Sequence, residues 1–186
     1  MRLLLAGIVG GIVVFIWGAI THVVLPLGEM GIQNLPNEEG IVDELKEGIS
    51  EPGLYFFPGM DMNRKLSPEE QQAWEAKYTA GPTGILVYHP TGTKPLSAKL
   101  LLTELVADIA AALLAAFILS HTIGSFSMRV LLVGLIGIMA WFSISVSYWN
   151  WYGFPTAFTM AEGIDQFVGW LLAGAPMAAI VKPASK

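Results

Sequence analysis

Four long apolar stretches constrain this chain more than any other feature of its sequence. Each is long enough to cross about 30 Å of hydrocarbon as a helix, which takes about 20 residues. We therefore predict an all-α membrane protein in which four transmembrane helices pack as a bundle. The stretches are Leu3–Leu25, about Leu100–Leu119, Val130 to about Trp149, and about Ile164–Val181, which contains Pro176.

The composition fits membrane spans around a polar insert. Of the 186 residues, 54% are hydrophobic and only 13% are charged, and most of the acidic residues lie between Glu29 and Glu75. A soluble domain has about 25% charged residues. Cysteine is absent, which excludes disulfides, thiolate metal sites and cysteine nucleophiles. The chain has no basic block, so nucleic acid is not expected as a partner.

These features divide the chain into three segments. Residues 1–26 form the first transmembrane helix, residues 27–97 form a small α+β insert, and residues 98–186 carry transmembrane helices two to four. We expect the first stretch to remain as a membrane helix. It is longer than the apolar region of a cleaved signal peptide, about 7–15 residues, and no convincing cleavage site follows it.

The basic residues that flank the spans predict the orientation. Arg2, Arg129, Lys182 and Lys186 all fall on one side of a four-span protein, and short cytoplasmic flanks are enriched in Lys and Arg. Both termini are therefore expected in the cytoplasm, with residues 27–97 extracytoplasmic. The interpretation is a multi-pass protein of the cytoplasmic membrane, which in a bacterium is the inner membrane.

The insert carries alternating helix and strand signals. A first helix is expected after Asn37, a plausible N-cap, and a second after Ser67, where Ser67 and Glu70 match a capping box. Apolar runs at residues 54–57 and 84–88 predict strands. We expect a small cap packed on the membrane helices, which serves as a docking surface, a lid or a structural plug.

Polar residues within the spans share helix faces with small residues. Such faces are where membrane helices approach one another, so the polar groups are expected to point into the bundle. On the first span His22 follows Gly7, Gly11 and Gly18. On the second Glu104 and Asp108 precede Ala112. On the fourth Asp165 precedes Gly169 and Ala173.

These positions predict an outward-facing polar pocket formed by His22, Glu104, Asp108, Asn150 and Asp165. Carboxylates with an imidazole can bind a cation or relay protons, although neither a metal nor a cofactor is specified. Structural alternatives remain open. Glu104 and Asp108 can accept hydrogen bonds from Ser143, Ser145, Ser147 or Tyr148, and Asp165 can favour the helix dipole. Glu162 matches a capping box with Thr159.

The most distinctive string lies between the third and fourth spans. It contains Tyr148, Trp149, Trp151 and Tyr152, and such aromatic clusters commonly anchor a protein at the membrane interface. We interpret it as an interfacial anchor. The alternative is a surface that stacks on a quinone, a pigment or a lipid headgroup.

Several strings give the chain a family resemblance. They are residues 17–27, Leu35-Pro36-Asn37-Glu38, residues 52–58 (PGLYFFP) and residues 148–155 (YWNWYGFP). In these the chain resembles small, uncharacterised bacterial integral membrane proteins. The resemblance implies a membrane location and a bacterial type, and no mechanism.

Three functional hypotheses follow. The first is a non-enzymatic accessory or scaffolding subunit, whose partners are the lipid bilayer and other membrane protein subunits or further copies of itself. The second is a protein that binds or transports a cation or protons through the acidic pocket. The third is a membrane enzyme or a quinone-linked redox subunit. No nucleophile constellation, phosphate loop or cofactor motif supports the third.

Overall fold

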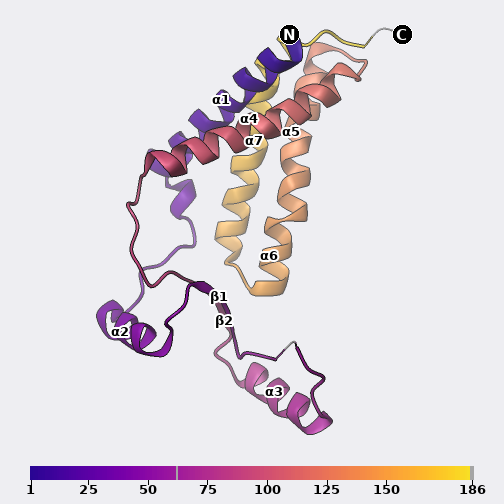
Figure 1. The fold of residues 1–186 in the computed structure, drawn as a ribbon. Helices are drawn as coiled ribbons and strands as arrows, with labels where there is room; N and C mark the ends of the chain where they lie inside the picture. Colours follow the sequence, from indigo (N-terminus) through magenta and orange to yellow (C-terminus); the bar gives the residue numbers. More distant parts are fainter. Residues whose placement is uncertain (62, 185–186) are drawn as a thin grey trace. The chain divides into compact units, whose positions relative to one another are not determined.

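A computed structural model describes residues 1–61 and 63–184 and contains four helices that are long and apolar enough to cross a membrane. They are α1 (Arg2–Val23), α4 (Ala98–Ser120), α5 (Phe126–Ser143) continued by α6 (Ser145–Tyr152), and α7 (Thr156–Ile180) (Figure 1). The predicted fold class, a transmembrane helix bundle with a small α+β insert after the first helix, is confirmed. The chain is a multi-pass membrane protein.

The chain separates into two compact units, which we call the membrane unit and the insert. The membrane unit comprises Met1–Ile32 and the chain from Pro95 onward, and the insert is Gln33–Lys94. The insert is therefore shorter at both ends than residues 27–97. One reason is the short 3-10 helix η1 (Pro26–Glu29), which packs against α1 and α7.

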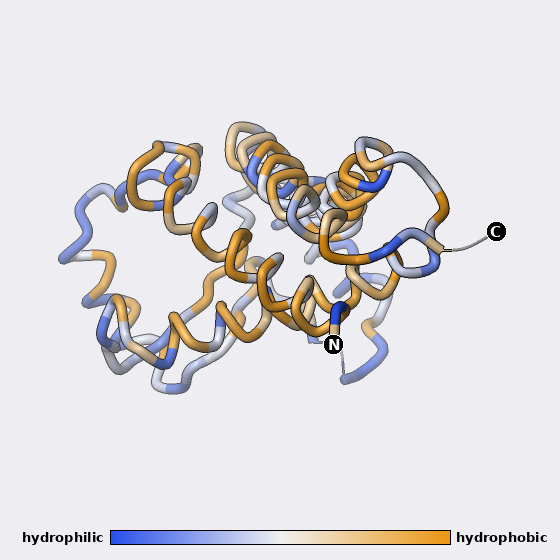
Figure 2. The backbone as a smooth tube through the Cα atoms, turned by 90° about the horizontal axis from the view of Figure 1, so that it is seen from above, coloured by the Kyte–Doolittle hydropathy of each residue, from blue (hydrophilic) through white to orange (hydrophobic). Residues whose placement is uncertain are grey.

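Within the membrane unit, α1 packs between α4 and α7, and α7 in turn packs against α5. Small residues allow this close approach. Gly7 lies against Leu113 and Gly11 against the backbone of Ile109 in α4. Figure 2 shows the long helices as mostly hydrophobic along their length, as lipid contact requires.

The core of the membrane unit lies toward the end where α1 begins and where α4 and α7 end. Its buried residues come from all four transmembrane helices and are mostly small: Ala6, Ala112, Ala115, Ala116, Leu119, Val133, Trp170, Ala173, Met177 and Val181. The buried residues of α4 all belong to its second half. The first half of α4 therefore lacks this close packing, which leaves room beside α1.

Arg129 differs from the simple flanking charge that the sequence suggested. It lies in the first turn of α5 and is 2% exposed. Its guanidinium donates hydrogen bonds to the carbonyl oxygens of Leu119, Ala178 and Val181, at 3.3, 3.1 and 3.1 Å. The last carbonyls of a helix lack partners within the helix and form the negative end of its dipole, so Arg129 ties the ends of α4 and α7 to α5.

The fourth span starts earlier than predicted. We placed its start near Ile164, but α7 begins at Thr156, with Pro155 at the N-cap position. The predicted capping box at Thr159 and Glu162 is therefore wrong: Thr159 lies within the helix, and its hydroxyl donates to the carbonyl of Pro155. Polar residues in the first half of α7 lower its hydropathy and hide its start.

The insert has the predicted order of helix, strand, helix and strand. The elements are α2 (Glu38–Gly48), β1 (Gly53–Phe57), α3 (Pro68–Ala80) and β2 (Gly84–Tyr88). The two strands pair antiparallel, with Leu54 opposite Val87 and Phe56 opposite Ile85. Whether the insert caps the membrane helices stays a prediction.

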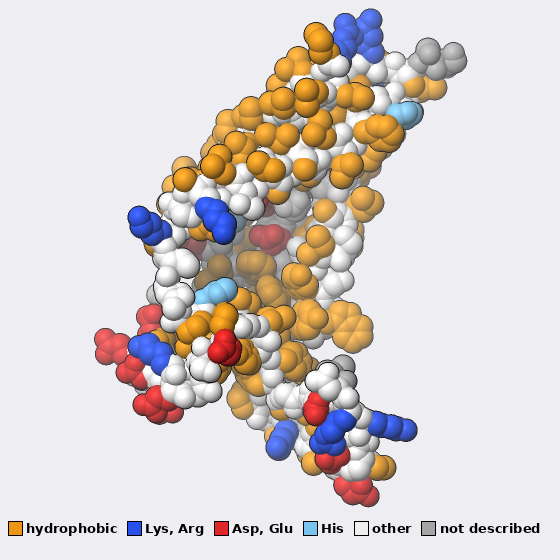
Figure 3. Space-filling model, viewed as in Figure 1, with side chains coloured by type: hydrophobic (Ala, Val, Ile, Leu, Met, Phe, Trp, Pro, Cys, Tyr) orange, Lys and Arg blue, Asp and Glu red, His pale blue; other side chains and the backbone are white. Residues whose placement is uncertain are grey.

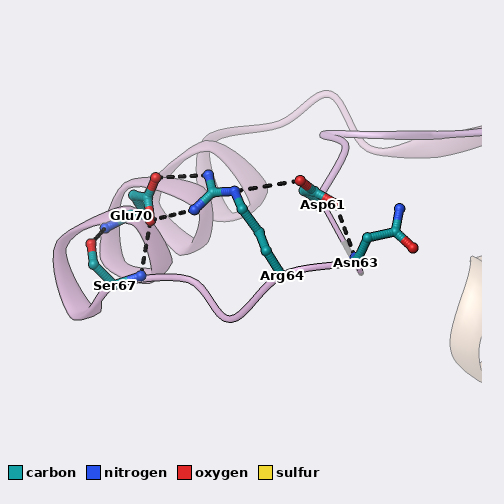
Figure 4. A network of polar contacts seen from close by, with 5 residues as sticks. All are labelled: Asp61, Asn63, Arg64, Ser67 and Glu70. Atoms are coloured by element: carbon teal, nitrogen blue, oxygen red, sulfur yellow. Dashed lines mark hydrogen bonds and ion pairs between the residues drawn. The ribbon is translucent and has the colours of Figure 1, made fainter.

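The two predicted helix caps of the insert have different outcomes. Asn37 precedes α2 but takes a left-handed conformation with φ of 50°, and its side chain makes no capping hydrogen bond. Ser67 and Glu70 form the predicted capping box. Figure 4 shows that Glu70 also accepts two hydrogen bonds from Arg64, at 2.7 and 2.9 Å. This local network fixes the start of α3.

Candidate functional site

A cavity of about 480 Å³ lies within the membrane unit, among α1, α4 and α7. It adjoins the first half of α4, where the core packing ends. Figure 3 shows carboxylate side chains in a hollow between the helices. Its size falls in the range of about 300–1,000 Å³ that is typical of small-molecule sites.

Four carboxylates from two helices line this cavity: Glu104, Asp108, Glu162 and Asp165. Glu104 and Asp108 are four residues apart on α4, and Glu162 and Asp165 are three apart on α7, so each pair shares one helix face. Each pair begins about 9 Å along its helix, at 1.5 Å per residue. Ionisable groups inside a membrane span are costly and are a sign of function.

The carboxylates interact as like charges across the cavity. Glu104 and Asp165 both repel the carboxylate of Asp108, and Asp165 also repels that of Glu162. No salt bridge to these carboxylates occurs among the residues that the structure describes. Asp165 Oδ1 is buried and has no hydrogen-bond partner there. The site is therefore electrostatically suited to a positively charged ligand.

His22 contributes the only imidazole among the residues that line the cavity. Its Nδ1 atom is 2.9 Å from the carbonyl oxygen of Gly18, one turn earlier in α1. In the tautomer that donates to this carbonyl, Nε2 is left as an acceptor.

Aromatic side chains form part of the cavity wall: Phe15, Trp17 and Trp170. The indole N–H of Trp17 donates to the carbonyl oxygen of Asp165 at 3.2 Å. That of Trp170 donates to Gln166 Oε1, also at 3.2 Å. Both indole N–H groups are thus already bonded within the protein.

The arrangement does not form a metal centre as it stands. Within residues 1–61 and 63–184, no three His, Asp or Glu side chains come close enough to hold a metal ion. The acidic groups surround a volume instead of converging on a point. This geometry suits a ligand larger than a bare ion.

The structure brings four of the five predicted pocket residues to one cavity: His22, Glu104, Asp108 and Asp165. Asn150 is an exception, because it lies exposed on α6 and does not line the cavity. Gly18 also differs from its predicted packing role. A Cβ atom placed there meets no described atom within 4 Å, and Gly18 lines the cavity.

The other predicted packing positions lie at helix contacts. Ala112 and Ala173 are fully buried, and Gly169 lies against Trp17. The serine alternative for Glu104 and Asp108 finds no support, since the Ser143 hydroxyl donates to the carbonyl of Ala140 in its own helix. Ser145, Ser147 and Tyr148 belong to α6, which packs against α5 and α7.

Sequence reasoning missed several cavity residues, including three on α7. Glu162 was assigned to a helix cap, and Gln166 and Trp170 were not considered at all. The signal was present in the spacing, since residues 162, 165, 166 and 169 share one face of a helix. It was hidden because the helix was expected to start only at residue 164.

The aromatic string on α6 lies apart from this cavity. Tyr148, Trp149, Trp151 and Tyr152 are 44–72% exposed. The Trp149 indole donates to Thr156 Oγ1 at 3.1 Å, which links α6 to the start of α7. These exposed rings at the end of a membrane span fit an interfacial anchor.

Comparison with protein-family models, with curated proteins and with solved structures finds no match.

Proposed function

We propose that this chain is a cation-binding protein of the cytoplasmic membrane that holds its ligand in the cavity among α1, α4 and α7. The observation that carries the proposal is the set of four carboxylates around one intramembrane volume, with no basic partner in the described residues. Uncompensated acidic groups within a span are costly, and a bound cation offsets that cost.

The proposed orientation places both termini in the cytoplasm and the insert outside. Arg2 and Lys182 flank the membrane unit at the end where α1 begins and α7 ends (Figure 1), and Lys186 lies outside the described residues. Basic flanks favour the cytoplasmic side. In this orientation the cavity, which adjoins the last turns of α1 and the first half of α4, lies toward the extracytoplasmic face.

The test is direct binding to the full-length protein in lipid nanodiscs, measured by isothermal titration calorimetry with Na⁺, Ca²⁺ and tetramethylammonium as probes. We expect at least one of these cations to bind the wild type. The double variant Asp108→Asn/Asp165→Asn should bind it at least tenfold more weakly. The control Glu38→Gln/Glu39→Gln removes the same charge from the insert and should bind as the wild type does.

Binding that does not depend on the carboxylates would contradict the proposal. So would the absence of binding by all three probes and by the larger organic cation benzyltrimethylammonium. Cross-linking of the nanodisc sample should also show that the carboxamide variant keeps its oligomeric state. A change in that state would assign the loss of binding to altered assembly.

The accessory or scaffolding subunit is the second candidate, and the incomplete packing of the first half of α4 favours it. In that case a lysine or arginine from a partner helix neutralises the cavity. Purification from the native membrane in mild detergent, followed by mass spectrometry, distinguishes the two. A stoichiometric partner lost in Asp108→Asn/Asp165→Asn supports the subunit, and a chain isolated without a partner supports ligand binding.

A further inference from the structure

The proposed function leaves the kind of cation open, and the cavity wall bears on it. Besides the carboxylates, most of the wall is apolar, and Phe15, Trp17 and Trp170 supply its aromatic surface. Inorganic cations are held by converging oxygen ligands. An apolar and aromatic wall contributes little to such an ion and contributes much to an organic one.

The volume leads to the same conclusion. A cavity of about 480 Å³ greatly exceeds the space of a single ion or water molecule, which needs only about 10–15 Å³ by this kind of measure. Filling it requires either many waters or a ligand with several carbon atoms. Hydrating an apolar wall is unfavourable, so a ligand with its own apolar surface fits better.

We propose that the ligand is an organic ammonium cation that carries an apolar group, bound with its charge between the carboxylates of α4 and α7 and its apolar group against Phe15 and Trp17. This inference rests on the proposed function. Aromatic rings attract ammonium groups through their negative faces, and the carboxylates supply the net charge. Together they select against neutral apolar molecules and against small inorganic ions.

The test compares two cations and a neutral analogue: tetramethylammonium, benzyltrimethylammonium and benzyl alcohol. Each is titrated into the wild type in nanodiscs, with empty nanodiscs as the reference for partition into lipid. Benzyltrimethylammonium should bind at least tenfold more tightly than tetramethylammonium, because it buries an additional apolar ring. Benzyl alcohol should bind at least tenfold more weakly than benzyltrimethylammonium.

Two substitutions in the cavity wall test where the apolar group of the ligand binds. Phe15→Leu and Trp17→Leu should each weaken benzyltrimethylammonium binding about threefold to tenfold, and weaken tetramethylammonium less. Trp151→Leu, on the exposed surface of α6, is the matched control and should have no effect. Because Trp17 also packs against Gly169, Phe15→Leu keeps the test informative if Trp17→Leu does not fold.

The outcomes distinguish a failure of the organic-ligand inference from a failure of the cation-binding function. Equal binding of the two cations, or unchanged affinity in Phe15→Leu, overturns the organic ligand and leaves the cation-binding function standing. Binding of neither cation, together with no response to Na⁺ or Ca²⁺, overturns both. Tighter benzyltrimethylammonium binding that is lost in Asp108→Asn/Asp165→Asn and weakened in Phe15→Leu supports both.

Discussion

The membrane unit and the insert are stabilised by different interactions. The membrane unit has a continuous core of small buried residues, whereas no residue of the insert that the structure describes is buried. The insert instead relies on a two-stranded pairing, a capping box and ion pairs on its surface. Two strands alone and exposed ion pairs contribute little stability.

This difference predicts which substitutions and solution conditions should destabilise each unit. Close helix packing makes the membrane unit sensitive to changes of one methyl group and tolerant of solution conditions. The insert should tolerate most side-chain substitutions and respond to pH and salt, because exposed charges are screened and titrate readily. The cavity is the exception within the membrane unit, since four carboxylates line it.

Arg129→Met should have the largest effect on the membrane unit. It removes three hydrogen bonds from a buried guanidinium and leaves the Ala178 and Val181 carbonyls at the end of α7 without this donor, at a cost of about 3 kcal/mol. The measurement is the thermal unfolding midpoint in detergent. Arg2→Met, at an exposed residue of α1, is the control. Equal midpoints for the two variants would show that the buried contacts are dispensable.

Gly11→Ala should destabilise the membrane unit by about 2 kcal/mol. Its new Cβ atom would lie about 2.5 Å from the backbone of Ile109, which cannot move aside as a side chain can. Gly18→Ala is the matched control, because the space there is open. The unfolding midpoints of the two variants, measured side by side, test the packing of α1 on α4. A smaller loss in Gly11→Ala than in Gly18→Ala would refute it.

Asp108→Asn should stabilise the ligand-free protein slightly, by about 1 kcal/mol, because it removes a charge that Glu104 and Asp165 repel. Asp43→Asn, in the insert, removes an attraction to Lys46 instead and should not stabilise. The comparison requires low salt and no added organic cation. A lower unfolding midpoint for Asp108→Asn would mean that this carboxylate has a stabilising partner.

Protonation of Glu70 should have the smallest effect on stability, and that effect should be confined to α3. Hydrogen bonds from Arg64 and from the Ser67 backbone lower the pKa of Glu70 from 4.5 to about 2. Since the folded pKa is the lower one, its contribution to stability is complete well above pH 4.5 and is lost as the pH falls toward 2. The protection factors of the α3 amides against hydrogen exchange, which correct for the intrinsic pH dependence of exchange, should therefore fall as the pH is lowered across this window.

Two variants check the assignment to Glu70. Glu70→Gln should lower the protection factors of the α3 amides at neutral pH and remove most of the pH dependence of that protection. Glu69→Gln, beside it in the first turn, should retain the wild-type profile. If Glu69→Gln removed the pH dependence instead, the network drawn in Figure 4 would not be its source.

Local patterns in the sequence were sufficient for several features. The apolar lengths gave four spans, and the signals at Ser67 and at residues 84–88 located α3 and β2. The spacing of Glu104 and Asp108 gave their shared face. Each of these depends on residues near one another in the chain. Asn37 shows the limit, because its type favours a cap but its backbone is left-handed.

What the sequence by itself determined, then, is that four helices cross the membrane, that a small α+β insert follows the first, and that the acids of α4 share a face. Only the tertiary structure decided that Glu162 and Asp165 of α7 meet that face around one cavity, that Arg129 is buried against two helix ends, and that Asn150 is excluded. The physical reason is that helical periodicity is fixed over a few residues, whereas the angles at which helices cross depend on packing between residues far apart in the chain, such as Gly10 and Met177.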